Sequence, residues 1–80
     1  MKTNDIKSDY KIQLHNGWHG IMKDNKKGNI RLCEVQGIYT ETGSIYAHDI
    51  KSVFNPINNK WENAEYTPAQ LKLKTLVNKF

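Results

Sequence analysis

The fold is decided by the stretch Tyr10-Lys11-Ile12-Gln13-Leu14-His15-Asn16-Gly17-Trp18-His19-Gly20-Ile21-Met22-Lys23. Apolar and polar side chains alternate over residues 10–15, which is typical of a strand with one buried face. Asn16-Gly17 is a turn signal, and Trp18, Gly20 and Met22 then continue the alternation on one face. The sequence therefore predicts two antiparallel strands, 10–15 and 18–23, joined by a tight turn.

A third strand is predicted over residues 30–39, after a polar loop over 24–29 that contains a glycine. Its apolar residues alternate at first, but the period slips at Cys33. The slip, together with Gly37, indicates a bulged or sharply curved strand.

The chain then offers a second turn at 40–43 and a short strand at 44–48, while residues 49–54 fit either a one-turn helix or a final strand. About five short antiparallel strands separated by Gly and Asn turns predict a mainly β fold, a small barrel over residues 10–55. Closure of a barrel would remove the unpaired edges that template aggregation.

The end of the chain carries a different pattern, and we expect a connector over 56–66 followed by a C-terminal amphipathic helix over 67–80. Thr67 can cap the first turn, Pro68 lies where its missing N–H is harmless, and Gln70 can complete a capping box. Apolar residues at helical spacing form one face, namely Ala69, Leu73, Leu76, Val77 and Phe80. Alternate apolar positions at 71, 73 and 77 leave an added strand as the alternative.

Length and composition limit the class of protein to which the chain can belong. The chain has 80 residues, of which 38% are hydrophobic and 25% charged, so we expect one small globular domain over 1–80. No apolar run is long enough to span a membrane, and the opening residues lack the apolar core of a signal peptide. A single cysteine cannot form an internal disulfide. We therefore expect a cytoplasmic protein without a membrane partner.

Charge is unevenly distributed along the chain, whose net charge is +4. Residues 18–33 and 67–80 each carry three more basic than acidic side chains, while residues 34–66 carry an acidic excess. A polyanion would therefore meet the first two segments rather than the whole surface. The eleven Lys, nine Asn and one Arg are the usage expected of an AT-rich genome, such as that of a low-GC bacterium or its phages.

The segment 12–21, with Gly17 and Gly20 three residues apart, resembles the opening of Src-homology-3-like (SH3-like) barrels of the KOW and Tudor type. Residues 43–50 resemble the fourth strand of those domains and the short helical turn that follows it. The resemblance covers roughly residues 10–55 and implies an SH3-like barrel. One glycine usual in KOW motifs is absent, so the resemblance implies the fold more than the RNA association of those motifs.

Neither a metal site nor a catalytic site is predicted, and no cofactor is expected. His15 and His19 are four residues apart, a spacing that brings two zinc ligands together only when both lie on one turn of a helix. Here they fall on different predicted strands. Cys33 lies in an apolar strand, where a buried thiol is inert. The carboxylates have no spacing that specifies an acid and base pair. We therefore expect a binding module rather than an enzyme.

Lysines and aromatic rings are the candidate binding residues. Phosphates attract lysine whatever the base sequence, and flat rings offer stacking surfaces for bases. The predicted nucleic-acid site consists of Lys11, Trp18, Lys23, Lys26, Lys27, Arg31 and Tyr39. Trp61 is expected to be partly exposed on the connector, while Trp18, Tyr46 and Phe54 could equally fill the barrel.

The alternative function is a protein adaptor or inhibitor, encoded by a phage and bound to a host protein. It would use an aromatic patch and the face of the C-terminal helix. The two functions differ in their response to salt, because charge-led binding weakens steeply as salt rises.

Overall fold

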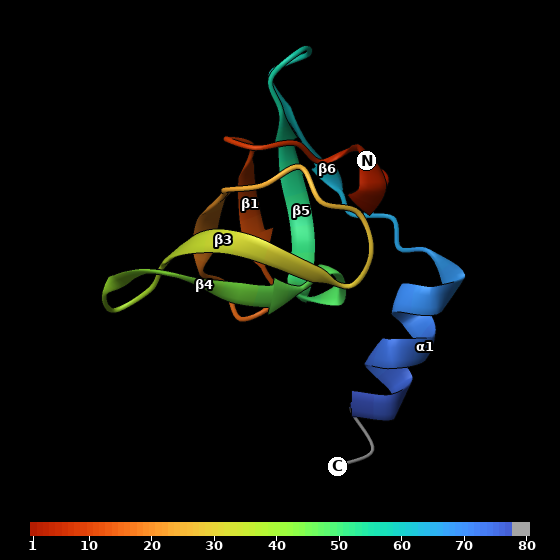
Figure 1. Ribbon diagram of the computed structural model, residues 1–80. Helices are drawn as coiled ribbons and strands as arrows, with labels where there is room; N and C mark the ends of the chain where they lie inside the picture. Colours follow the sequence, from red (N-terminus) through yellow and green to blue (C-terminus); the bar gives the residue numbers. More distant parts are fainter. Residues whose placement is uncertain (78–80) are drawn as a thin grey trace.

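Six antiparallel strands and one C-terminal helix make up the fold in the computed structural model, which describes residues 1–77 (Figure 1). The elements are a short 3-10 helix η1 (Thr3–Asp5), β1 (Lys11–Leu14), β2 (His19–Met22), β3 (Ile30–Gln36), β4 (Thr40–Tyr46), a second 3-10 helix η2 (Ala47–Asp49), β5 (Ile50–Asn55), β6 (Lys60–Asn63) and α1 (Pro68–Val77). The prediction of a mainly β antiparallel fold with a C-terminal helix is confirmed.

The strands form one sheet in the order β4-β3-β2-β1-β5-β6. Strands β1 to β4 follow one another as hairpins, and β5 returns to pair with β1. Figure 1 shows β5 running steeply across β3 and β4, so the sheet is strongly coiled. Its two edges, β4 and β6, do not pair with each other, and the prediction of a closed barrel is wrong: β6 adds to the free side of β5 instead.

Strand β3 is regular, and the bulge predicted at Cys33 is absent from its pairing with both neighbours. Arg31 and Cys33 are both buried, whereas Ile30 and Leu32 are exposed. The period therefore does not slip, because the side chain that breaks the apolar pattern is a buried arginine. The irregularity in the sheet lies instead where β1 pairs with β5, between Gln13 and Leu14.

The turn between β3 and β4 lies at residues 37–39, and the prediction of a turn at 40–43 is wrong. Gly37 N–H donates to the carbonyl of Tyr39. A Cβ on residue 37 would lie 2.6 Å from the ring of Trp18, so only glycine allows the ring to pack there. Gly43 lies within β4 opposite Cys33, where an added Cβ would meet open space.

The predicted connector contains a strand that the sequence pattern did not reveal. In β6, Trp61 pairs with Phe54 and Glu62 pairs with Val53. The alternatives for residues 49–54 are also resolved, since η2 ends at Asp49 and β5 begins at Ile50. Trp61 is therefore held by a strand and not by a loop.

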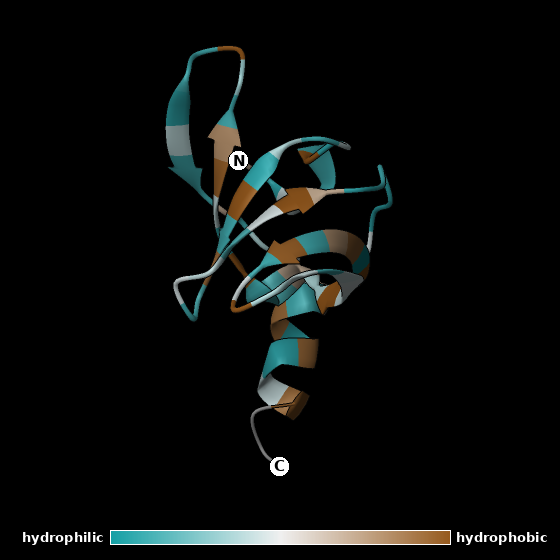
Figure 2. Ribbon diagram, turned by 90° about the vertical axis from the view of Figure 1, so that its left-hand side faces the viewer, coloured by the Kyte–Doolittle hydropathy of each residue, from teal (hydrophilic) through white to brown (hydrophobic). Residues whose placement is uncertain are grey.

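The core lies on one face of the coiled sheet and consists of Ile6, Ile12, Leu14, Met22, Cys33, Ile50 and Val53. Figure 2 shows the resulting alternation of hydrophobic and hydrophilic residues along the strands. The segment before β1 belongs to this core through Ile6, and it also pairs with the chain before α1 through a parallel bridge between Lys2 and Glu65.

Helix α1 begins with the predicted capping box. Gln70 N–H donates to Thr67 Oγ1 (3.2 Å) and Thr67 N–H donates to Gln70 Oε1 (3.0 Å). The Gln70 side chain is buried and fixes the helix to the sheet domain: its Oε1 accepts from Thr3 Oγ1 (2.7 Å) and its Nε2 donates to the Gly28 carbonyl (3.1 Å). The alternative of an added strand is wrong. Residues 78–80 of the predicted helix lie outside the described residues.

Candidate nucleic-acid interface

The loop over residues 23–29, which joins β2 to β3 and is called the basic loop below, is held in one conformation by its own hydrogen bonds. Asp24 Oδ1 accepts from Lys26 N–H (3.3 Å) and Asp24 Oδ2 accepts from Leu32 N–H (2.8 Å). Asn25 Oδ1 accepts from Ser8 N–H (2.7 Å). These contacts fix the start of the loop against both β3 and the segment before β1.

Arg31 supports the loop from beneath rather than adding to its surface. Its side chain is 1% exposed, and its guanidinium donates to the carbonyls of Gly28 (3.1 Å) and Thr3 (2.9 Å) and to Asn4 Oδ1 (3.0 Å). Burial lowers the pKa of Arg31, an effect that the nearby Asp24 partly opposes. Arg31 is therefore buried away from solvent and stands apart from the other predicted phosphate ligands.

The three lysines of the loop differ in their surroundings. Lys23 Nζ forms an ion pair with Glu34 Oε2 at 3.2 Å, and both side chains are partly exposed, so the pair contributes little stability. Lys26 and Lys27 are exposed and form no ion pair with any residue of 1–77. Their charges are the ones that the loop presents to solvent.

Trp18 and Tyr39, the two predicted stacking rings, lie at the opposite end of β2 and β3 from the basic loop. Together with Ile38 and Glu41 they line a small hollow of about 190 Å³. Strand β2 has four residues, so about 10 Å of strand separates the two ends. The two rings and the basic loop therefore form two separate groups, not one patch.

Lys11 belongs to a third feature, a groove on the face of the sheet opposite the core. This outer groove of about 390 Å³ is lined by Lys11, Ile12, His19, Gly20, Ile21, Gln36 and Trp61. Trp61 is 47% exposed, as expected from the sequence. Its ring centroid lies 6.0 Å from that of His19, although β1 and β5 separate β2 from β6 in the sheet.

The outer groove is the part of the surface that sequence reasoning missed. Its residues come from β1, β2, β3 and β6, and the last of these strands was not predicted. The signal that could have found it is the alternation Trp61-Glu62-Asn63 beside the apolar Val53-Phe54, which favours a hairpin across Asn55-Pro56.

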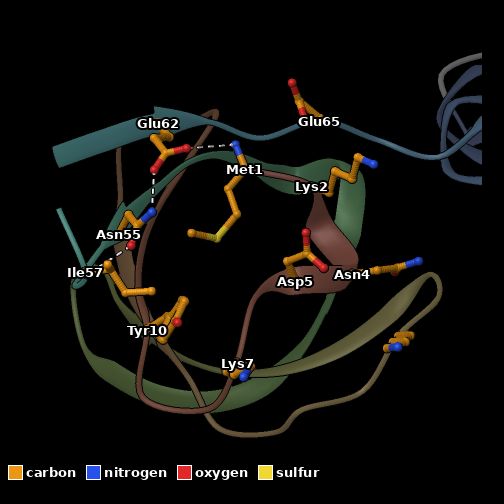
Figure 3. Close-up of a pocket in the computed structure, with 11 residues that line it drawn as sticks. Met1, Lys2, Asn4, Asp5, Lys7, Tyr10, Asn55, Ile57, Glu62 and Glu65 are labelled. Carbon is orange, nitrogen blue, oxygen red and sulfur yellow. Dashed lines mark hydrogen bonds and ion pairs between the residues drawn. The ribbon is translucent and has the colours of Figure 1, made fainter. Parts of the chain in front are cut away.

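The largest hollow has a different character. Figure 3 looks into it, and shows Met1, Tyr10 and Ile57 inside a ring of backbone. Its volume is about 690 Å³, and its lining mixes both signs of charge: the Met1 ammonium, Lys2, Lys7 and Lys27 with Asp5, Glu62 and Glu65. Because acidic groups lie among the basic ones, the hollow as a whole offers a polyanion little net attraction.

Glu62 is engaged at the rim of that hollow. It accepts from Asn55 Nδ2 at 2.6 Å and lies 3.6 Å from the Met1 ammonium (Figure 3). The hydrogen bond from Asn55 is the main cause that lowers the pKa of Glu62.

Cys33 is fully buried, and desolvation raises the pKa of its thiol to about 11. A thiol that stays protonated at neutral pH is a poor nucleophile and a poor metal ligand. In the part of the chain that the structure describes, no three His, Cys, Asp or Glu side chains gather as a metal site would require. Over residues 1–77 there is also no helix with the length and apolar character needed to cross a membrane.

No protein-family model matches the chain, and no curated protein or solved structure matches it significantly. The six-stranded coiled sheet is compatible with a small barrel-like fold. The interpretation of its function therefore depends on the surface features described above.

Proposed function

We propose that this chain is a non-enzymatic binding module that holds nucleic acid through phosphate contacts made by the basic loop and Lys11. The observation that carries the proposal is the pair Lys26 and Lys27, which is exposed and unpaired among the described residues on a loop held by Asp24, Asn25 and Gly28. A loop that is already ordered loses little entropy on binding, so its charges act at low cost.

The chemistry of such a site is independent of base sequence. Lysine contacts to phosphates release counterions, so the affinity should fall steeply as salt rises. The net charge of +4 gives only a modest preference for a polyanion over an acidic peptide. The clustering of lysines in the basic loop strengthens that preference.

We also propose that the domain is a divergent SH3-like barrel of the KOW or Tudor type. Residues 43–50, which carry part of the resemblance, cover the end of β4 and all of η2. The pairing of β1 to β4 as successive hairpins, with β5 returning to pair with β1, gives one coiled antiparallel sheet, and this strand order supports a small barrel-like fold.

The test is fluorescence anisotropy with a labelled oligonucleotide at low salt. Replacing Lys26 and Lys27 with Gln should weaken binding about 10-fold or more and reduce the slope of log affinity against log salt by up to about two. The matched control replaces Lys51 and Lys72, which are exposed elsewhere, and so removes the same charge. Equal losses in the two variants, or no binding by the wild-type protein at low salt, would refute the proposal.

A second candidate function, the protein adaptor or inhibitor, is favoured by one observation on α1. Leu76 and Val77, two members of the predicted apolar face, are 47% and 39% exposed on a helix in which Gln70 is the buried residue among those described. An apolar helix face that stays exposed fits a hydrophobic groove of a partner. Replacing Leu76 and Val77 with Ser would weaken such a complex at every salt concentration and leave oligonucleotide binding unchanged.

A further inference from the structure

The outer groove contains an aromatic ring that is held in place before any ligand arrives. The Trp61 ring meets the Phe54 ring at a centroid distance of 5.5 Å and an angle of 71°, and the His19 ring at 6.0 Å and 62°. Such edge-to-face contacts are favourable for aromatic pairs and fix the orientation of the indole. Nearly half of the Trp61 surface nevertheless remains open to solvent.

The charge of the groove is positive. Lys11 is exposed within it, and none of the described residues that line it is acidic. Glu62, the neighbour of Trp61 in sequence, is engaged by Asn55 and the Met1 ammonium at a different hollow. An ammonium beside a fixed, exposed ring matches the phosphate and the base of one nucleotide.

The groove is also connected to the basic loop. Ile21, in its lining, pairs in register with Glu34 on β3, and Glu34 holds Lys23 at the start of the loop. A strand lying along β2 would therefore have a base in the groove and a neighbouring phosphate near Lys23, the first lysine of the basic loop.

From this arrangement we propose that the outer groove binds an unpaired base of single-stranded nucleic acid, with Trp61 stacking on the base and Lys11 contacting its phosphate. The inference rests on the proposed nucleic-acid function and narrows its ligand. In a duplex both faces of each base are covered by its neighbours, so Trp61 can stack only on a base that is free. The site therefore distinguishes single strands from duplexes.

The test compares an oligothymidylate with a mixed-sequence duplex of equal length, both fluorescently labelled. Trp61→Ala should weaken binding to the single strand by about 10-fold, the effect of losing one base–aromatic stack, and leave duplex binding unchanged. Trp61→Phe, which keeps a ring, should retain most of the affinity. In a Trp18→Phe background, the single strand should quench the fluorescence of Trp61.

A second variant keeps the test decisive if Trp61→Ala unfolds the protein. Lys11→Gln changes one exposed side chain and should weaken single-strand binding several-fold while reducing the salt slope by about one. If Trp61→Ala and Lys11→Gln both bind the single strand like the wild type, the groove inference is overturned, while a loss caused by the Lys26 and Lys27 variant would still support the proposed function. Quenching of Trp61 by a peptide but not by the oligonucleotide would also overturn the inference.

Discussion

Arg31→Lys tests whether the single arginine is a structural residue or a phosphate ligand. The substitution keeps the positive charge but replaces a planar fork of donors with one ammonium on a different stem. Arg31 donates three hydrogen bonds, to Gly28, Thr3 and Asn4. If lysine keeps one of them, two charged bonds are lost at about 1.5 kcal/mol each, and the free energy of unfolding falls by about 3 kcal/mol. For a domain of this size that lowers Tm by roughly 12–24 °C.

The assay is urea and thermal unfolding followed by circular dichroism. Lys26→Gln serves as the control, because an exposed loop side chain should change the free energy of unfolding by no more than about 0.5 kcal/mol. At a temperature where the Arg31 variant is folded, its oligonucleotide affinity should change less than that of the Lys26 and Lys27 variant. A stability change below about 1 kcal/mol, or a large loss of binding without a loss of stability, would refute a structural role.

Three further predictions concern the core and the helix. Gly20→Ala should cost about 1–3 kcal/mol of unfolding free energy, since its Cβ would lie 2.6 Å from Cys33 Sγ; an unchanged urea midpoint would contradict this packing. Burial raises the pKa of the Cys33 thiol from about 9 in the unfolded chain to about 11 in the folded protein. The free energy of unfolding should therefore fall by about 2–3 kcal/mol as the pH rises between these values. Cys33→Ala should remove that part of the fall, and an identical pH profile in the variant would assign it to other groups. Gln70→Ala should cost about 2 kcal/mol, because it removes the side-chain half of the capping box and the hydrogen bonds to Thr3 and Gly28, and far-UV circular dichroism that keeps full helicity together with an unchanged Tm would argue against it.

The parts of the fold that were predicted are those where a local pattern determines the structure. Alternation with one buried face is confirmed in β1 and β2, and the capping box starts α1 at Pro68. The missed parts depend on pairing between distant segments. Strand β6 has only four residues, and what stabilises it is the register with β5, which no local pattern reveals.

The candidate site could be predicted only in part, for the same reason. Exposed Lys26 and Lys27 follow from a polar loop, but the burial of Arg31 depends on carbonyls of η1 and the loop that meet only after folding. The turn predicted around Gly43 was wrong because an exposed edge strand tolerates glycine as well as a loop does. Lys11 and Trp61 are 50 positions apart in the sequence, and only the coiled sheet brings them into one groove.

The most direct test of the proposed interface is a titration of ¹⁵N-labelled protein with an unlabelled single-stranded oligonucleotide, followed by NMR at low salt. The proposal predicts that the indole N–H of Trp61 and the amides of His19 and Ile21 shift, together with those of the basic loop, while the amides of α1 do not. Shifts confined to α1, or the absence of shifts at saturating oligonucleotide, would contradict it.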